Sequence, residues 1–400
     1  MSTEHVMRRG GEGVAAAGLG SLLTVLIATC CGALAANIYY AQPLIALIGD
    51  SVGMARASES AIVTVSQIGY AIGLLLLVPI GDVIDSRRLI IATMAANVLS
   101  LICMAAAPGA ALLFAAMAIV GVTSAAAQML VPLAASLAPP DARGRIVGNV
   151  MVGLLLGILL ARPVASFLSG YVGWRGVFAL SAGLITLLAF ACLLWLPNRP
   201  TAPRQSYATL IASLGRLFVT QPVLRRRGFY HAAIFASFSM FWTGAPLILL
   251  RPPFELSSNG VALFALAGVL GVLAAPVAGR LADRGHSRRG TILAIATAIG
   301  AFAVAILGQS HIAALVAAGI LIDLGAQANL VIGQREIYQL DPALRNRLNS
   351  IYMTMFFLGG AAGSALTSPV LESFGWPGLC ILGMAFPAAA LVYLFVSEPR

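Results

Sequence analysis

The stretch from Leu89 to Pro140 contains no charged residue. As a single helix it would reach about 78 Å, against a hydrocarbon core of about 30 Å. The stretch must therefore fold back on itself, and Pro108-Gly109 is the expected turn. Across the whole chain 60% of residues are apolar and 10% are charged, whereas a soluble domain carries roughly 25% charged residues. We therefore predict an all-α, polytopic membrane protein.

The basic residues are distributed unevenly along the chain. All 24 of them are arginines, and 20 lie in alternate loops and in the two tails. The four that fall towards the other side are Arg56, Arg162, Arg175 and Arg251. This asymmetry follows the positive-inside rule and predicts cytoplasmic termini. Membrane topology thus explains the net charge of +10 better than a nucleic acid partner does, and no nucleic acid is expected.

The apolar segments predict twelve membrane-spanning helices in two sets of six. The first set covers 16–42, 58–80, 88–107, 110–137, 146–168 and 174–196. The second covers 228–250, 259–279, 290–308, 311–335, 347–371 and 376–396. The predicted units are therefore an N-terminal bundle (1–196), a cytoplasmic linker (197–227) and a C-terminal bundle (228–400). Apolar residues at helical spacing predict an interfacial helix in the linker: Leu210, Ile211, Leu214, Leu217 and Phe218.

A short polar loop occurs twice in the chain. Gly81 and Asp85 in the first copy align with Gly279 and Asp283 in the second, at an offset of 198 residues. Other pairs recur at offsets of 199 to 202 residues: Gln128 with Gln327, Arg145 with Arg345, Asn149 with Asn349, and Gly173-Trp174 with Gly375-Trp376. Each copy contains six spans, so both enter the membrane in the same sense. Two such parallel bundles facing each other across a central cavity predict a transporter architecture.

These loops resemble the loop motif of the major facilitator superfamily, G-x-L-A-D-R-x-G-R-R/K, and the resemblance extends over nearly the whole chain. The stretch from Gly279 to Arg284 matches the first six positions of the motif. The first copy keeps its glycine and carboxylate, but the segment from Ser86 to Arg88 is compressed. The resemblance implies the major facilitator fold and a gate that latches the two halves. The gating residues that it implies are Gly81, Asp85, Arg87, Arg88, Gly279, Asp283 and Arg284.

Two further stretches, Asn37 to Leu44 and Asp323 to Gln327, look like bacterial members of the drug:proton antiporter branch of that family. This resemblance implies proton-coupled efflux. The sequence departs from the branch at two points. Met117 stands where efflux members carry an arginine in span four, and Ile158 stands where the antiporter pattern of span five has a proline. Proton symport or facilitated uptake therefore remains an alternative.

Asp323 is the predicted proton-coupling residue. The chain enters span ten near His311, and twelve residues of helix rise about 18 Å, which reaches the bilayer centre. An ionisable group at that depth is costly and usually functional. Burial favours the neutral form of a carboxyl group, so Asp323 could take up and release a proton as access alternates. The alternative is a structural carboxylate that is permanently hydrogen-bonded to a neighbouring helix.

Polar and aromatic residues at helical spacing are candidates for the substrate cavity. They are Asn37, Tyr40, Gln67, Tyr70, Gln128, Phe238, Trp242 and Gln327. The amides and phenols could equally bond helix to helix, and the aromatics could belong to packing or to an interface belt. Arg162 could contact a substrate anion in the cavity or snorkel to the outer headgroups, and we favour the second location.

The predicted function is secondary active transport by alternating access, with proton-coupled efflux of a small organic or amphipathic compound as the leading hypothesis. Uptake of a small metabolite is the alternative, and a membrane sensor or intramembrane enzyme is a remote one. No catalytic residue, metal ligand or cofactor is predicted, and ATP-driven transport is disfavoured because a nucleotide-binding loop needs a lysine. The expected partners are a small-molecule substrate, protons and the lipid bilayer of a bacterial inner membrane, around a monomer.

Overall fold

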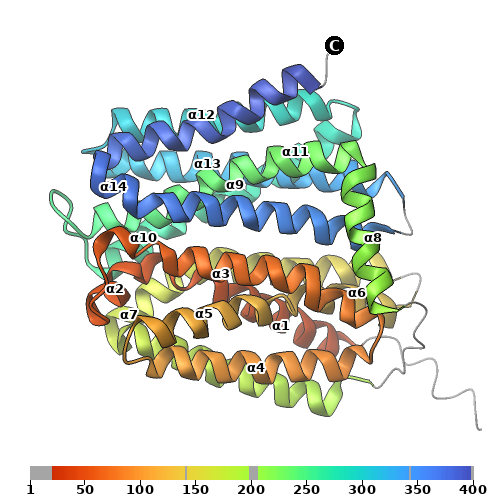
Figure 1. The fold of residues 1–400 in the computed structure, drawn as a ribbon. Coiled ribbons are helices and arrows are strands. Elements are labelled where there is room, and N and C mark those ends of the chain that lie inside the picture. The colour runs from red at the N-terminus through yellow and green to blue at the C-terminus, as the bar shows by residue number, and fades with distance from the viewer. Residues whose placement is uncertain (1–19, 140–141, 198–205, 342–343, 398–400) are drawn as a thin grey trace, which may run out of the picture.

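The computed structural model describes residues 20–139, 142–197, 206–341 and 344–397 (Figure 1). Over these ranges the chain forms helices and helical turns, and no strand. The first half contains α1 (Ser21–Tyr39), α2 (Ile45–Ser51), α3 (Ala61–Ile72), α4 (Ser86–Ala106), α5 (Ala110–Ser124), α6 (Ala127–Leu137) and α7 (Arg143–Trp195). The linker contains α8 (Tyr207–Thr220). The second half contains α9 (Pro222–Leu249), α10 (Ser258–Leu266), α11 (Ala274–Asp283), α12 (Ser287–Leu307), α13 (Ile312–Tyr338) and α14 (Arg345–Ser397).

Two of these helices each contain two membrane spans. α7 and α14 are both 53 residues long, and each turns back at a glycine with positive φ, Gly173 (67°) and Gly375 (63°). Glycine takes this conformation readily because it has no Cβ. The part of the chain that the structure describes has ten helical stretches long and apolar enough to cross a membrane, and these two count double. The predicted twelve-helix fold is thus confirmed.

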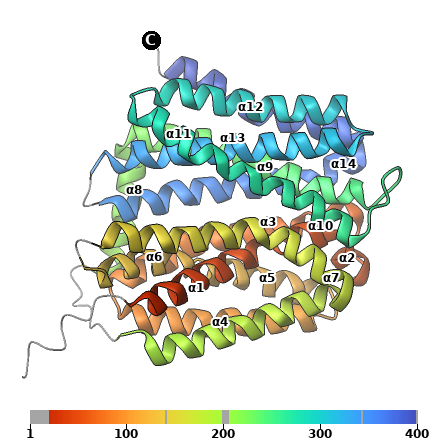
Figure 2. The ribbon, with the colours of Figure 1, turned by 180° about the vertical axis from the view of Figure 1, so that it is seen from behind.

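The helices form two bundles that lie side by side. α1 to α7 make one bundle and α9 to α14 make the other, and Figures 1 and 2 show the boundary between them from opposite sides. α3 and α7 of the first half pack against α14 and α10 of the second, respectively. Residues far apart in the sequence therefore meet along this boundary, where any site shared by the two halves must lie.

Several spans differ from their predicted extents. The first continues past Pro43 through a 3₁₀ turn into α2, because proline is accepted in the first turn of a new helix. α9 starts at Pro222, inside the predicted linker, and so its first turns carry Arg225 to Arg227. The prediction missed these turns because it searched for charge-free segments.

The second and eighth spans lose regular α-helix at equivalent positions. After α3 the chain forms a π-helical turn over Gly73–Leu77 and a 3₁₀ turn over Val78–Asp82. After α10 it forms a 3₁₀ stretch over Ala267–Leu273 before α11 begins. The two repeat mates Gly73 and Gly271 both lie in these irregular stretches, at an offset of 198 residues. The predicted spans 58–80 and 259–279 are thus continuous helical stretches of which only part is α-helix.

Close contacts between small residues hold each bundle together. A Cβ added at Gly157 would collide with the backbone of Gly32, and one added at Gly153 would lie 2.5 Å from the carbonyl oxygen of Ala28. In the second half, a Cβ at Gly363 would collide with the backbone of Ala236. Membrane helices commonly associate through such small-residue contacts. α1 and α7 in one half, and α9 and α14 in the other, therefore pack almost backbone to backbone.

The linker helix α8 bonds to both halves. The hydroxyl of Tyr207 donates to the carbonyl oxygen of Leu76 at 2.8 Å, and Nη1 of Arg347 donates to Oγ of Ser213 at 3.3 Å. α8 buries Leu210, Leu214 and Leu217 against the bundles. It lies at the edge of the molecule that also carries the α3–α4 and α11–α12 loops (Figure 1). We call this edge the arginine-rich end and the other, which carries α2, the opposite end.

Candidate functional site

Asp323 lies in the middle of α13 with its side chain only 1% exposed. Trp242 of α9 donates its Nε1–H to Oδ2 of Asp323 at 2.8 Å. Nη2 of Arg162, which belongs to α7, lies 3.7 Å from Oδ1. An ion pair buried in the interior thus connects the N-terminal half to the C-terminal half.

Arg162 is held by aromatic rings as well as by the carboxylate. Its Cζ atom lies 4.1 Å from the ring centroid of Trp242 and 5.0 Å from that of Phe238. Cation–π contacts of this kind strengthen when water is excluded. The expected location at the outer headgroups is therefore wrong, since the side chain is 3% exposed and points to the boundary between the halves. Asp323 of α13 and the two rings of α9 compensate part of the arginine's lost hydration.

The irregular stretch of the eighth span packs directly on this pair. A Cβ added at Gly268 would lie 2.8 Å from Cζ2 of Trp242 and 3.0 Å from Oδ2 of Asp323. A Cβ added at Gly271 would collide with the side chain of Asp323. These two glycines therefore let the backbone of α10–α11 form a close wall beside the carboxylate.

Protein groups satisfy only part of the hydrogen-bonding capacity of the pair. Among the described residues, none hydrogen-bonds to Nε or Nη1 of Arg162 or to Oδ1 of Asp323, although these atoms are buried. Most buried polar groups in proteins do have a partner. Tyr39 of α1, which the prediction passed over for its neighbour Tyr40, lies within electrostatic reach of both charges. Burial, unused hydrogen-bonding atoms and opposite charges thus coincide at one place.

Asn37 bonds helix to helix instead of facing a cavity. Its Nδ2 donates to Oδ1 of Asn97 at 3.0 Å, and its Oδ1 accepts from the hydroxyl of Ser181 at 2.6 Å. Nδ2 of Asn97 donates in turn to Oγ1 of Thr123 at 2.8 Å. α1, α4, α5 and α7 meet in this neutral network, so the cavity role expected for Asn37 has no support here. The signal that was missed is Asn97, an amide inside an otherwise apolar span.

Gln67 and Tyr70 lie on the boundary between the halves. Nε2 of Gln67 donates to Oγ of Ser239 across it at 2.9 Å. The Tyr70 ring lies 4.3 Å from that of Phe357 in α14, and its hydroxyl accepts from Nε2 of Gln128 at 3.3 Å. The structure therefore brings three of the predicted cavity residues together near this contact. The remaining two, Tyr40 and Gln327, are half-buried, and Gln327 lies one turn of α13 beyond Asp323.

The loop residues of the first half bind partners within that half. The carboxylate of Asp85 caps α4 by accepting from the backbone N–H of Arg88 at 2.8 Å. Nη2 of Arg87 donates to the carbonyl oxygen of Leu193 in α7 at 2.5 Å. A Cβ added at Gly81 would have its nearest neighbour at 3.7 Å, an ordinary contact distance. The surrounding atoms therefore do not require a glycine at this position.

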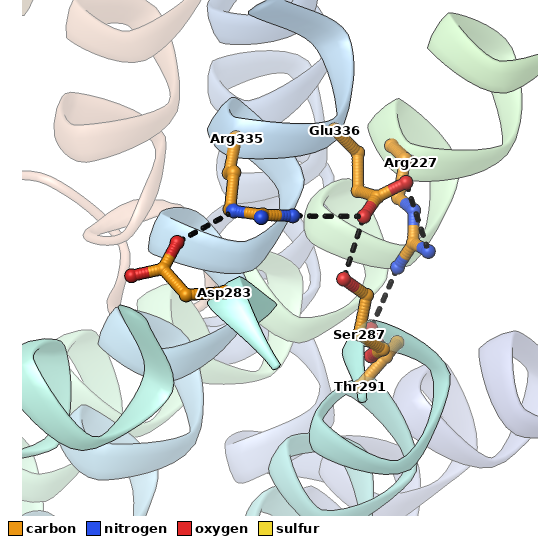
Figure 3. A network of polar contacts seen from close by, with 6 residues as sticks. All are labelled: Arg227, Asp283, Ser287, Thr291, Arg335 and Glu336. Carbon is orange, nitrogen blue, oxygen red and sulfur yellow. Dashed lines mark hydrogen bonds and ion pairs between the residues drawn. The ribbon is translucent and has the colours of Figure 1, made fainter. Parts of the chain in front are cut away.

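The loop of the second half belongs to a larger polar network (Figure 3). Oδ1 of Asp283 accepts from Nε of Arg335 at 2.9 Å, and Nη1 of Arg335 lies 3.9 Å from Oε1 of Glu336. Glu336 accepts from the hydroxyl of Ser287 at 2.6 Å and lies 3.9 Å from Nη2 of Arg227. All these residues lie in the C-terminal half, so the network ties α9, α11, α12 and α13 to one another.

Gly279 and Arg284, which the family resemblance predicts to take part in gating, lie in the same region as Arg227. A Cβ at Gly279 would lie 3.9 Å from its nearest neighbour, and Arg284 is exposed at the end of α11. Nη1 of Arg227 donates to the hydroxyl of Thr291 at 2.7 Å. Sequence reasoning missed Arg227 because it counted that arginine as a loop charge, although the side chain is buried.

A second ion pair connects the halves at the opposite end. Glu59, next to α3 and 2% exposed, lies 3.9 Å from Nη2 of Arg251, which follows α9. Beside it, Ser60 and Ser368 exchange two bonds, each hydroxyl accepting from the other residue's backbone N–H at 3.1 Å. The sequence did not reveal this contact, because Glu59 lies at the very start of the predicted span 58–80 and its partner Arg251 follows another span, so no local pattern joins them.

Comparison with known proteins gives the same picture as the fold and the repeated loops. The family model of the Major Facilitator Superfamily matches residues 25–334 and 254–400. The chain belongs to the major facilitator superfamily. A protein of Escherichia coli O157:H7 named uncharacterized transporter YgaY is 39% identical over 378 residues, which cover 94% of this chain and 95% of that protein.

Solved structures of major facilitator proteins share the fold. A crystal structure of the nucleoside transporter NupG superposes with a TM-score of 0.75 at 14% identity, covering 94% of this chain and 99% of that one. A bacterial homologue of the human lysosomal transporter Spinster, in an inward-facing and unoccupied conformation, gives a TM-score of 0.74 at 14% identity, covering 94% and 96%. The protein is thus a multi-pass membrane transporter of this superfamily. In the described ranges no group of three His, Cys, Asp or Glu residues is arranged to hold a metal ion.

Proposed function

We propose that this protein is a proton-coupled secondary active transporter of a small organic compound, and that Asp323 takes up and releases the proton. The observation that carries the proposal is the buried ion pair of Arg162 and Asp323, to which each half contributes one member. Ionisable groups inside membrane proteins are costly and usually functional. A pair that joins the two moving parts is suited to couple protonation to their movement.

Protonation of Asp323 changes the attraction between the halves. While the carboxylate is ionised, it attracts Arg162 strongly, because both side chains are shielded from water. Once the carboxyl is neutral, most of this attraction is lost, whereas a hydrogen bond from Trp242 remains possible. Alternating access requires the halves to move against each other around a central site. A proton on Asp323 would therefore make that movement easier at the point where the substrate binds.

We further propose that the two ends of the molecule act as alternating gates. In the described residues, the contacts of Asp85, Arg87 and Asp283 stay within their own halves, whereas Glu59 and Ser60 bond across the boundary at the opposite end. Closure of the arginine-rich end would bring the loop residues into contacts across the boundary. Opening of the opposite end would break those of Glu59 and Ser60.

The proposal places the protein as a monomer in the inner membrane of a bacterium, with the arginine-rich end and both termini in the cytoplasm. Efflux, the leading hypothesis from the sequence, and uptake would both use Asp323. In antiport the substrate competes with the proton, whereas in symport the two bind together. The sign of the substrate-driven pH change distinguishes these directions.

The experiment uses the full chain in liposomes that contain a pH-sensitive dye. Ligands are first selected by thermal shift from a panel of organic anions, neutral sugars and organic cations. A selected compound added outside should change the internal pH in wild-type vesicles, and Asp323→Asn should abolish this change. Glu255→Gln, which alters an exposed acid between α9 and α10, is the matched control and should behave as wild type. Proton movement by Asp323→Asn at the wild-type rate would refute the proposal.

A further inference from the structure

Arg162 has N–H groups that no described residue uses. Neither Nε nor Nη1 has an acceptor, and Nη2 lies 3.7 Å from the carboxylate of Asp323, beyond hydrogen-bond length. A guanidinium can grip a planar oxyanion along either of two edges, one formed by Nε and Nη2 and the other by both Nη atoms. Each edge of Arg162 contains one of the unused groups. Both edges of the guanidinium therefore keep a donor that an oxyanion can use.

A row of aromatic rings continues from Arg162 along the boundary between the halves. Successive ring centroids are 3.5 to 4.9 Å apart, and the row consists of Phe238, Phe235, Phe356, Phe357 and Tyr70. The row begins at Phe238 of α9, whose ring lies against Arg162. It continues through Phe356 and Phe357 of α14 and ends at Tyr70 of α3, in the other half. These rings are buried against one another in this structure, and separation of the halves along the boundary would uncover them as apolar and stacking surface for the body of a ligand. The charged group and the aromatic surface thus adjoin.

The charge balance of the site discriminates between ligands. With Asp323 ionised, the pair is neutral, and a bound cation would leave a net positive charge beside Arg162. With Asp323 protonated, Arg162 is unbalanced, and an anion restores neutrality. Net charge buried away from water is costly. A neutral compound keeps the balance but does not need the proton, whereas an anion and a proton each compensate the charge that the other brings, so an anion makes the two bind together.

We propose that the substrate is an organic anion with an aromatic or similarly apolar body, whose oxyanion binds Arg162 while Asp323 carries a proton, so that the two move in the same direction. This inference rests on the proposed proton role of Asp323 and names the substrate class for the same site. The oxyanion takes the place of the Asp323 carboxylate as the partner of Arg162. Release of the substrate and loss of the proton restore the original ion pair.

The surroundings of Asp323 contain few groups that could compete for this role. α7 contributes Arg162, α9 the neutral donor Trp242, and α1 the phenol of Tyr39. The 3₁₀ stretch on the remaining side contributes Gly268 and Gly271, which bring no charge. In the described part of the chain, Arg162 is thus the one cation paired with Asp323.

Binding is tested on the purified full chain with three probes of similar shape. They are benzenesulfonate, which stays ionised at all accessible pH values, neutral benzamide and cationic benzylamine. Benzenesulfonate should bind most tightly, and its affinity should rise as the pH falls and Asp323 becomes protonated. Arg162→Gln should weaken it by about tenfold or more, and Arg162→Lys should be intermediate because lysine lacks the fork. Equal affinity for benzylamine, or no effect of Arg162→Gln, would overturn the proposal.

Two further variants separate the substrate class from the coupling. Asp323→Asn mimics the neutral acid, so it should bind benzenesulfonate at all pH values while no longer moving protons in liposomes. In wild-type vesicles, external benzenesulfonate should acidify the lumen. The double variant R162Q/D323N removes both charges, should fold because it leaves no unpaired charge, and should bind none of the anion. If a cation were instead transported in exchange for protons, the proposed substrate class would be refuted, while the proposed proton-coupled function would stand. Anion binding that is independent of pH and of Asp323 would refute the proposed function instead.

Discussion

The two halves share one scaffold but differ at equivalent positions of their interiors. Asp323 of the C-terminal half corresponds, at the repeat offset of 199 residues, to Ser124 of the N-terminal half. Ser124 accepts a bond of 3.4 Å from Asn97 and so belongs to the neutral network of its own half. Asp323 instead pairs with Arg162 of the other half. One copy has a hydroxyl directed inward, and the other has a carboxylate at the boundary.

Equivalent positions at the arginine-rich end also differ in charge between the two halves. Arg335, which binds Asp283, corresponds to Ser136 at an offset of 199 residues. Thr291 accepts from Arg227, whereas its mate Thr93, at an offset of 198 residues, donates to the carbonyl oxygen of Leu89 in its own helix. At the positions of Asp323 and Arg335 the C-terminal half thus has charged side chains, where the N-terminal half has the hydroxyls of Ser124 and Ser136. Neutral hydrogen bonds do not respond to pH, but a carboxylate does. We infer that the N-terminal half is the frame and the C-terminal half the responsive part.

The largest effect on stability is expected at the ion pair between the halves. Asp323→Asn or Arg162→Gln should each lower the free energy of unfolding by about 3 kcal/mol at high pH, because Arg162 stays charged and unpaired in the first variant and the Asp323 carboxylate loses its cation in the second. R162Q/D323N should recover most of this loss. Denaturant unfolding of the wild type, the two single variants and the double variant measures the interaction energy of the two side chains as a double-mutant cycle. Additive losses would mean that the two side chains do not interact, and that the halves are not joined here.

An intermediate effect is expected in the neutral network of the N-terminal half. Asn97→Leu should cost about 2 kcal/mol, because it removes the partner of the buried amide of Asn37. Ser124→Ala removes only the 3.4 Å contact and serves as the milder control. Asn97→Leu and Ser124→Ala should each retain substrate-driven proton movement in liposomes, provided that the variant folds. Loss of coupling at unchanged stability would contradict the view that this half is a frame.

The smallest effects on stability are expected in the two repeated loops. Here the variant in the N-terminal half should cost more than the variant in the C-terminal half. Asp85→Ala removes a helix cap and should cost about 1 kcal/mol. Asp283→Ala removes an ion pair whose carboxylate is 72% exposed and should cost below about 0.5 kcal/mol. Thermal unfolding at low and high salt compares them, and only the effect of Asp283→Ala should shrink with salt. Equal salt dependence would show that both loops are held by charge.

The scaffold could be predicted because it depends on properties that are local in the sequence. Charge-free length determines how many times the chain must cross the bilayer, and the recurrence of Gly173-Trp174 at Gly375-Trp376 marks the same turn in each half. The expected depth of Asp323 followed from helix rise alone, and in the structure its side chain is buried in the middle of α13. None of these inferences needed to know which helices are neighbours.

The partners of the polar residues could not be predicted in this way. Asn37 and Tyr40 share a helical face, yet Asn37 bonds to Asn97 inside its own bundle. Arg162 lies at a position along α7 that suits snorkelling equally well, and its partners inside come from α9 and α13. Gly271 looks like any other glycine of an apolar span until Asp323 is seen to lie against it. Each of these roles depends on contacts between residues far apart in the chain.

The sequence by itself determined that this protein spans the membrane in two parallel sets of six helices, with the repeated loops at one end and an acid deep in span ten. These properties follow from the cost of placing charge and unpaired backbone in hydrocarbon, which acts on each segment separately. Only the tertiary structure decided that the acid faces Arg162 of the other half, and that the repeated loops lie latched within their own halves. Both depend on how the bundles pack against each other, since an ion pair forms only where two helices bring opposite charges together.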